Sequence, residues 1–318
     1  MHKCENSTAN IFHILAFSTS NTGQCLLFIV VLLMLLITVL GNVIITVLVC
    51  LVSQLRTPMY FFLGNLAITD IMFVLVIFPK LLSILQTQDN RMFFSSCMSQ
   101  VYFFSFLGTS DSLVMTCMAY DRYVAICKPL QYLSIMSRDV CILLSLCSWL
   151  LSIINGIINA IVTSELSFCP EQNINHFFCD QKTLYAITSS DATNRNILMV
   201  FQDVIVASLP FLLIITSYVL IIATILKIRT AKGRRKAFSS CTSHVTTVIL
   251  FYGPVIVIYA KPDSEGSQEL DKLLTLLYTA VVPMLNPFVY TLRNKEILDA
   301  IHNLTKKGNV FLMRLFKE

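Results

Sequence analysis

Residues 25–51 read CLLFIVVLLMLLITVLGNVIITVLVCL, a run of 27 residues without Asp, Glu, Lys or Arg. A helix needs about 20 predominantly apolar residues to cross the hydrocarbon core of a bilayer. The uncharged stretch around this run is longer still, because no Asp, Glu, Lys or Arg lies between Glu5 and Arg56. Residues 25–51 are therefore predicted to form a membrane-spanning helix.

Six further segments of membrane-crossing length follow the first. Two of them are interrupted only by a single acid, Asp70 in one and Asp111 in the other, and four are uncharged. Long, continuously apolar runs favour helices over barrel strands, which alternate over about 10 residues. We therefore predict an all-α, seven-transmembrane helix bundle whose spans cover residues 25–51, 58–78, 96–120, 140–164, 204–226, 237–260 and 273–292.

The composition leads to the same class of protein. Hydrophobic residues make up 56% of the 318 residues, and charged residues only 13%, whereas a soluble domain carries about 25% charged residues. One globule of this size cannot bury so much apolar surface, so lipid must cover it. We expect a single domain over residues 1–318, with a leader at 1–24, the bundle at 25–292 and a tail at 293–318.

Basic residues indicate the orientation in the membrane. The leader and the loops on its side hold 7 Lys and Arg, and the opposite loops with the tail hold 16. The positive-inside rule then places the N-terminus outside the cell and the tail in the cytosol. The strongest cluster, residues 227–236, has six basic residues in ten; it suits anionic lipid headgroups, and we expect it also to contact a cytosolic partner.

The two ends of the chain carry further signals. The first span begins too far from the N-terminus for a typical cleaved signal peptide, so we interpret it as an uncleaved anchor. Asn6 begins an N-glycosylation sequon on the outer side, whereas the second sequon, at Asn303, lies on the cytosolic side, where no glycan is expected. A short amphipathic C-terminal helix on the inner leaflet is predicted from the helical spacing of Ile297, Ala300, Ile301 and Leu304.

Polar residues inside the spans are the first candidates for function. Ionisable groups in a membrane core are costly and mark functional sites by default. Asp70, Asp111 and Asn286 lie at similar predicted depth, where they could hold one Na⁺ ion or pass a proton. The alternative is that each acid is protonated and hydrogen-bonded within the bundle.

Other residues suggest a bundle that moves. Asp121-Arg122-Tyr123 closes the third span at its cytosolic end, where an Arg that cannot lose its proton must pair, reach the headgroups or meet a partner. Prolines bend helices and free backbone carbonyl groups. Bends are therefore expected in the fifth span at Pro210 and around Asn286 at Pro283 and Pro287. Such a bundle is expected to have two conformations.

Four of the eleven cysteines lie outside the spans. An oxidising outer face permits disulfides among Cys4, Cys97, Cys169 and Cys179, and four cysteines allow three pairings. The pattern His176-x-x-Cys179-Asp180 could ligate copper or zinc, but a half-cystine is the favoured interpretation.

Several longer motifs occur in one order along the chain. They are PMYFFL (58–63), MAYDRYVAIC (118–127) followed by KPL, KAFSSC (236–241), FYG (251–253), and PMLNP (283–287) followed by Tyr290. Each alone would be weak evidence, but the set resembles the odorant (olfactory) receptors, a family of rhodopsin-like (class A) G-protein-coupled receptors. The resemblance extends over nearly the whole chain.

The resemblance implies a function and roles for individual residues. It implies a plasma-membrane receptor, not an enzyme, that binds small volatile odorants and activates an olfactory-type stimulatory G protein, which raises cyclic AMP. It implies a disulfide between Cys97 and Cys179. It also implies a switch toward the G protein made by Asp121, Arg122, Tyr123 and Tyr218, with Asn286, Pro287 and Tyr290 relaying the shift of the seventh helix. Apart from Na⁺ no cofactor is expected, and no nucleic-acid partner.

Three positions depart from the family pattern. Asp111 stands where the family usually has Glu, which weakens the sodium assignment. Ser189 replaces a frequent cysteine, so Cys169 lacks its usual partner and is either free or paired with Cys4. Thr183 stands where proline is common, which predicts a softer loop.

A pocket for small apolar molecules needs concave apolar walls and a few polar groups. Residues spaced three or four apart on the third span can share one face. If Asp203 faces the pocket, it favours ligands with a hydrogen-bond donor or a positive charge; the preferred alternative is a solvated cap at headgroup level. The predicted pocket residues are Phe104, Ser105, Gly108, Thr109, Gln202, Val206, Ile256 and Tyr259.

Other functions are disfavoured by what the sequence lacks. A transporter predicts internal repeats and broken helices in matching halves, and no repeat is visible. A retinal receptor needs a lysine in the seventh span, and residues 273–292 contain none. An amine receptor would be expected to have an aspartate in place of Phe104. A peptide receptor is disfavoured by the short leader and the apolar pocket.

Overall fold

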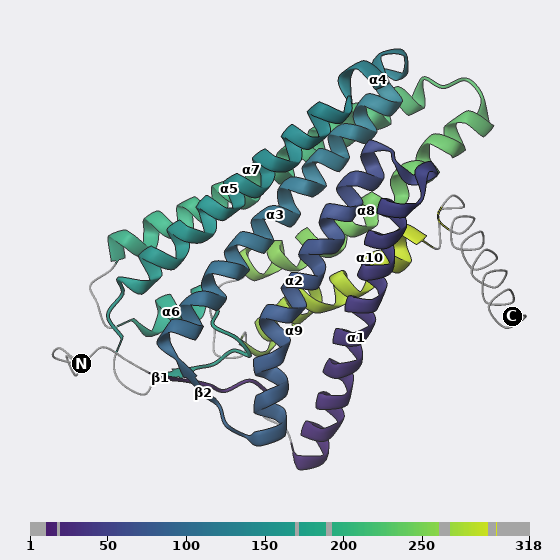
Figure 1. Ribbon diagram of the computed structural model, residues 1–318. Coiled ribbons are helices and arrows are strands. Elements are labelled where there is room, and N and C mark those ends of the chain that lie inside the picture. The colour runs from purple at the N-terminus through teal and green to yellow at the C-terminus, as the bar shows by residue number, and fades with distance from the viewer. Residues whose placement is uncertain are drawn as a thin grey trace, which may run out of the picture.

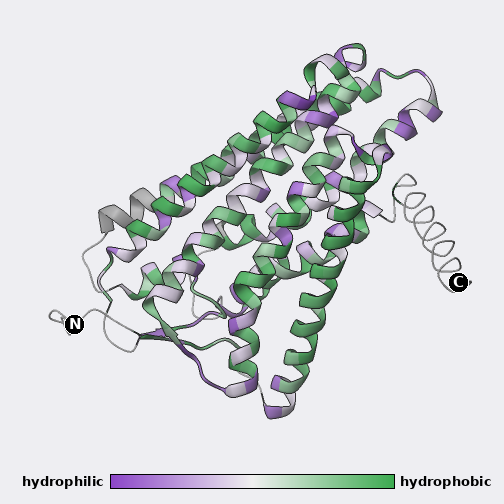
Figure 2. Cartoon of the chain, viewed as in Figure 1, coloured by the Kyte–Doolittle hydropathy of each residue, from purple (hydrophilic) through white to green (hydrophobic). Residues whose placement is uncertain are grey.

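The computed structural model describes residues 11–17, 20–168, 172–188, 193–260, 268–291 and 297, without the side chains of 193–200, 203 and 259. Seven helical segments in this part of the chain are long and apolar enough to cross a membrane, and Figure 2 shows them largely hydrophobic along their length. This confirms the predicted seven-helix bundle. Its helices are α1 (Asn21–Leu51), α2 (Pro58–Thr87), α3 (Phe94–Cys127), α5 (Arg138–Ser164), α7 (Thr193–Leu226), α8 (Ala231–Ala260), and the seventh, made of α9 (Gln268–Leu276), the π-helical η4 (Leu277–Val281) and α10 (Val282–Thr291).

The outer surface of the bundle is apolar. Large aliphatic side chains such as Leu26, Leu151 and Leu212 are each more than half exposed. Contiguous apolar surface on this scale is rare on soluble monomers. Lipid covers such surface, and the protein is therefore a multi-pass membrane protein.

A small sheet lies at one end of the bundle (Figure 1). The strand order is β2-β1-β3, formed by β2 (Arg91–Phe93), β1 (Ile11–Ile14) and β3 (Gln172–Ile174). β1 pairs antiparallel to β2, with Phe12 opposite Met92, and parallel to β3, with Phe12 opposite Gln172. Phe12 is fully buried and meets Phe168 edge-on at 5.2 Å. The end of the leader is thus folded into the protein, a feature that hydropathy did not predict; we call this end the sheet end.

Short elements complete the connections. Toward the sheet end, α6 (Gln181–Ile187) follows β3. The opposite end, which we call the Arg122 end, carries η1 (Ser53–Leu55), η2 (Pro129–Gln131) and α4 (Tyr132–Ile135) (Figure 1).

The second helix is longer than predicted. It continues from Phe78 through Pro79 and Lys80 to Thr87. Lys80 does not end the helix, because its ammonium group reaches the backbone oxygens of Asp89 at 3.1 Å and Arg91 at 2.7 Å in the following loop. A basic side chain can extend along a helix in this way to a polar end of the span.

The first and seventh helices approach closely around two prolines. Pro287 has no N–H group, so it cannot donate the usual helical hydrogen bond to the carbonyl of Pro283. Asn42 Nδ2 of α1 donates to that oxygen instead, at 3.0 Å. A Cβ atom added to Gly41 would lie 2.9 Å from Pro287 Cγ. The π-helical turn η4 ends two residues before Pro283. The predicted C-terminal amphipathic helix lies outside the described residues except for Ile297, which is buried.

Candidate functional site

A cavity of about 480 Å³ opens inside the bundle near the sheet end. Its walls come from α2, α3, α5, α7, α8, the seventh helix and the segment that carries β3 and α6. Aromatic rings form much of the apolar wall, and they include Phe73, Phe104, Phe251 and Tyr278. The size suits a small molecule, and the lining combines apolar surface with a few polar groups, as small-ligand sites do.

Five of the predicted pocket residues line this cavity: Phe104, Ser105, Gly108, Thr109 and Val206. The first four share one face of α3, as their spacing indicated. Gln202 stands one layer behind the wall, where its Nε2 donates to Oδ1 of the lining residue Asn155 at 2.9 Å. The side chains of Tyr259 and Asp203 lie outside the described part of the structure.

Ile256 does not line the cavity, contrary to the expectation. Its side chain is 47% exposed on the outer surface. Phe251, Val255 and Ile258 of α8 line the cavity instead. These three follow the spacing of one helix face, and Ile256 is rotated about 100° from its neighbour Val255. The face of α8 that lines the cavity is thus not the face on which Ile256 lies.

The cavity floor has polar groups that bind one another. Asn155 Nδ2 donates to Thr109 Oγ1 at 3.0 Å, and Thr109 Oγ1 donates to the Ser105 carbonyl at 2.7 Å. Ser112 and Tyr252 share a hydrogen bond of 2.5 Å between their hydroxyl groups. Sequence reasoning missed Asn155 and Tyr252, although an asparagine in the middle of an uncharged span is a signal that could have found the first.

The roof of the cavity, at the sheet end, carries charged groups. Lys182 Nζ of α6 lies 3.4 Å from Asp271 Oδ2 of α9, and Asn175 donates to Gln268 beside them. His176 also lines the cavity, and burial lowers its pKa to about 4, so the imidazole is neutral. None of these residues was predicted for the pocket, since their meeting depends on how two loops fold.

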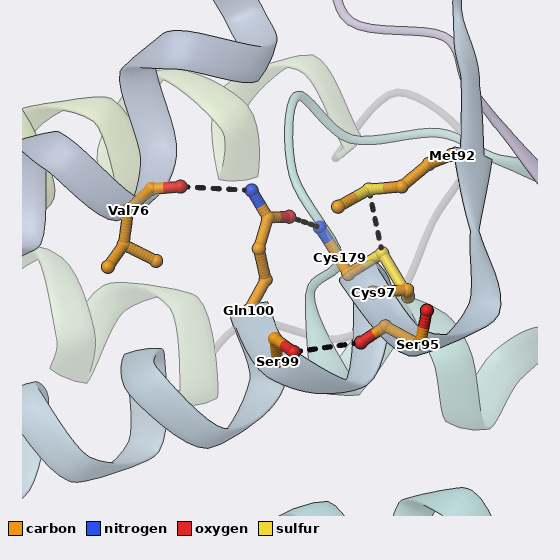
Figure 3. Close-up of a disulfide and its surroundings, with 7 residues drawn as sticks. All are labelled: Val76, Met92, Ser95, Cys97, Ser99, Gln100 and Cys179. Carbon is orange, nitrogen blue, oxygen red and sulfur yellow. Dashed lines mark hydrogen bonds between the residues drawn. A yellow bond between two sulfur atoms is a disulfide. The ribbon is translucent and has the colours of Figure 1, made fainter.

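The predicted disulfide between Cys97 and Cys179 is confirmed. It joins the start of α3 to the segment after β3 (Figure 3). Gln100 supports the same junction, because its Oε1 accepts from the Cys179 N–H at 3.0 Å and its Nε2 donates to the Val76 carbonyl at 3.1 Å. With Cys179 oxidised, the pattern His176-x-x-Cys179-Asp180 has no thiolate for a metal. Cys4, Cys169 and the sequon at Asn6 lie outside the described residues.

A layer of buried polar residues lies below the cavity. Asn286 Nδ2 donates to the two carboxylate oxygens of Asp70 at 2.9 and 3.3 Å. The Thr69 hydroxyl donates to Asp111. Asp70, Asp111 and Asn286 line one small hollow. The structure thus brings together the three polar residues that the sequence placed at similar depth.

Paired polar groups also close the Arg122 end. Arg122 forms an ion pair with the fully buried Asp121, and the Tyr132 hydroxyl donates to Asp121 at 2.7 Å. This pairing keeps the guanidinium group within the bundle. Tyr123 of the same motif is partly buried and packs against two clusters of buried apolar side chains.

His244 joins three helices between the two ends. Its Nε2 lies 3.0 Å from the Met115 carbonyl, which can only accept, so Nε2 carries the proton. In a neutral ring Nδ1 then accepts from the Tyr218 hydroxyl at 2.7 Å. Tyr218 on α7 is therefore linked through α8 to α3. Pro287 and Tyr290 of α10 are buried. Tyr290 belongs to an apolar cluster that includes Val124 of α3.

Comparison with known proteins identifies the family of this chain. Residues 31–307 match the family described as olfactory receptor. Olfactory receptor 1J21 of Mus musculus is 43% identical over 95% of this chain and 96% of its own length. Olfactory receptor 1 of Rattus norvegicus is 44% identical over 88% and 89%, and olfactory receptor 1J4 of Homo sapiens is 41% identical over 98% and 99%. The chain belongs to the olfactory receptor family.

One departure of this olfactory receptor from the family pattern has a structural consequence. Asp180 caps helix α6, and its Oδ2 accepts from the Thr183 N–H at 3.0 Å and from the Thr183 hydroxyl at 3.1 Å. A proline at position 183 would lack that N–H group. Thr183 therefore contributes to a capped short helix, where the sequence had suggested a softer loop.

Proposed function

We propose that this olfactory receptor binds small, volatile, mostly apolar molecules in the cavity beneath the sheet. The observation that carries the proposal is the cavity itself, about 480 Å³ in volume and walled by aromatic and aliphatic side chains. Its polar floor groups bind one another, so shape and apolar contact dominate recognition.

We further propose that ligand binding is reported to a stimulatory heterotrimeric G protein, which raises cyclic AMP. The Asp121–Arg122 ion pair and the Tyr132 bond to Asp121 hold the Arg122 end closed. A change of helix packing that separates Arg122 from Asp121 would free the guanidinium group for a partner. The N-terminus then lies outside the cell and the basic residues 227–236 lie in the cytosol, beside anionic lipid.

The buried polar layer supports a separate proposal, that one Na⁺ ion binds between Asp70 and Asp111. Oxygen ligands suit this cation, but the Asn286 amide already donates to Asp70 and Thr69 donates to Asp111, so the ion must displace donors. Exchange of Na⁺ for choline should lower the Tm of the wild type but not that of Asp70→Asn. Equal Tm values for the wild type in both salts would contradict the proposal.

A cyclic AMP reporter in cells carrying the receptor tests the main proposal, with a panel of volatile alcohols, ketones, acids and amines. We expect a dose-dependent response that Arg122→Ala abolishes while surface expression, measured with an antibody tag, is retained. Leu151→Ala, on the lipid-facing surface of α5, serves as the matched control and should respond like the wild type. A response that survives Arg122→Ala would contradict the proposed coupling.

A further inference from the structure

His176 is a buried polar residue in the wall of the ligand cavity. It lies between β3 and α6, is only 4% exposed, and is one of the residues that line the cavity. Its ring nitrogen Nδ1 is enclosed and has no hydrogen-bond partner. A buried polar group without a partner is costly, so the position of the proton on this ring matters.

The surroundings of the ring decide which nitrogen carries the proton. Burial lowers the pKa of His176 to about 4, so the imidazole is neutral and has one N–H group. An enclosed N–H group without an acceptor is rarer in proteins than an enclosed lone pair, which places the proton on Nε2. Across the part of the chain that the structure describes, Nε2 makes no hydrogen bond, and it is not enclosed as Nδ1 is. Its N–H group is therefore available to a molecule in the cavity.

The imidazole is held firmly in place. It stacks on Phe177 and meets Phe178 edge-on, with ring centroids 4.6 Å away in both cases. The backbone is fixed as well, because the His176 carbonyl accepts from the Ala16 N–H at 3.1 Å and the disulfide at Cys179 follows three residues later. A donor fixed in this way is preorganised, since a ligand does not have to order it on binding.

The other polar groups of the lining are less available to a ligand. Those of the floor bind one another, as described above. Ser105 on α3 is the rival donor, because it also lines the cavity and has a hydroxyl group. A serine hydroxyl within a helix can donate to the carbonyl of the preceding turn, whereas the His176 Nε2–H has no such acceptor on its own backbone.

We propose that His176 determines ligand specificity by donating a hydrogen bond from Nε2 to an oxygen atom of the ligand. This inference deepens the proposed function and rests on it. Ketones, aldehydes, esters and alcohols can accept this bond, whereas hydrocarbons and protonated amines cannot. The apolar walls supply most of the affinity, and this bond selects oxygen-containing ligands and orients their oxygen toward the sheet end.

The test compares a ligand with an analogue that lacks only the acceptor. The most potent oxygen-containing ligand of the volatile panel is paired with the analogue in which a methylene group replaces that oxygen, and both are measured with the cyclic AMP reporter. For the wild type, the EC50 of the analogue should be about tenfold higher, as expected for one neutral hydrogen bond. His176→Phe, which keeps an aromatic ring in the stack, should make the two EC50 values equal.

Two further substitutions identify the ring nitrogen. The amide nitrogen of glutamine reaches about as far from the backbone as Nε2 of histidine, and that of asparagine about as far as Nδ1. His176→Gln should therefore retain a preference for the oxygen-containing ligand, and His176→Asn should lose it. The opposite result would overturn the assignment to Nε2. Because each EC50 ratio is measured within one variant, differences in surface expression do not enter it.

His13 of β1 provides a matched control at the same end. Its Nδ1 is 3.0 Å from Asn90 Oδ1, and the residue does not line the cavity. His13→Phe and Ser105→Ala should both keep the wild-type EC50 ratio; loss of the preference in either would overturn the proposal. So would a His176→Phe variant that keeps the ratio, or a wild type that responds only to hydrocarbons or amines. A wild type silent to every probe would instead contradict the proposed function, and the inference with it.

Discussion

One residue in the wall of the cavity has no side chain. Gly108 lines the wall on α3, and a Cβ atom added there would meet nothing within 4 Å. Its place on the same face as Phe104 and Thr109 leaves open a volume that a methyl group would occupy. A larger residue at position 108 would therefore limit the size of the ligand without clashing with other residues of the receptor.

We accordingly predict that Gly108→Ala changes ligand selection but not stability. The EC50 of the largest active ligands should rise by about tenfold or more, the usual effect of one carbon in an apolar pocket, and small ligands should be little affected. Dose–response curves with a homologous ligand series measure this. Gly64→Ala, where the new Cβ makes only an ordinary contact at 3.6 Å with Val49, is the control; parallel shifts in the two variants would refute the prediction.

His176 makes the sheet end sensitive to acid. The ring lies 4.6 Å from both Phe177 and Phe178, stacked on the first and edge-on to the second. Burial lowers its pKa from 6.5 to about 4, while the surrounding charges of Asp180, Asp271 and Glu269 oppose that shift and Lys272 adds to it. Between these pH values the unfolded chain binds a proton at this residue and the folded protein does not. Stability is consequently lost as the pH falls from 6.5 toward 4.

The matching prediction is a smaller acid sensitivity in His176→Phe, which keeps an aromatic ring in the stack. The Tm of purified receptor should fall less between pH 6.5 and pH 4 in this variant than in the wild type. Comparing the two proteins in the same buffers cancels the contribution of every other titrating group. Identical Tm decreases in the two proteins would mean that the buried imidazole does not contribute to the loss of stability in acid.

At the scale of elements, the seventh helix depends on the first for its hydrogen bonding. The π-helical turn η4 and two prolines interrupt the regular bonding of the helix, and Asn42 of α1 supplies the donor that Pro287 cannot. Close approach of the two helices requires the absence of a side chain at Gly41. Small residues allow such approaches in membrane bundles generally.

Gly41→Ala should therefore destabilise the bundle. The added Cβ would lie 2.9 Å from the ring of Pro287, which is too close for both to stay in place. Overpacking of this kind costs about 1–3 kcal/mol, so the Tm in detergent should fall clearly. Gly64→Ala, with its contact at 3.6 Å, should leave Tm nearly unchanged. A Tm of Gly41→Ala equal to that of Gly64→Ala would show that α1 and α10 can separate freely.

The elements also show which features a sequence can predict. The seven spans follow from length and hydropathy, because lipid requires each helix to satisfy its own backbone. Phe104 and Thr109 were placed correctly on one face, since spacing within a helix fixes that relation. Ile256 was misplaced because the rotation of α8 within the bundle is set by tertiary packing. The Lys182–Asp271 pair was missed because the two residues lie 89 positions apart and meet only through folded loops.

For the whole molecule, the distribution of charge and the position of the sheet define two distinct faces. The sheet end carries β1 to β3 (Figure 1), the disulfide and the cavity roof. The Arg122 end carries the ion pair of Asp121 and Arg122. Disulfides persist in oxidising surroundings. The confirmed Cys97–Cys179 bond thus agrees with the excess of basic residues on the other side, and both favour a sheet end that faces outward.

Two sequons that are separated by seven spans in the sequence allow this orientation to be tested within one chain. Asn6 precedes β1 and Asn303 follows α10, and seven spans separate them. Because glycans are added only on the side that becomes extracellular, we predict that glycosidase treatment of the wild type lowers its apparent mass in a gel. Asn6→Gln should remove this shift, and Asn303→Gln should leave it unchanged. Loss of the glycan in Asn303→Gln alone would invert the proposed topology, and it would place the ligand cavity beyond the reach of odorants arriving from outside the cell.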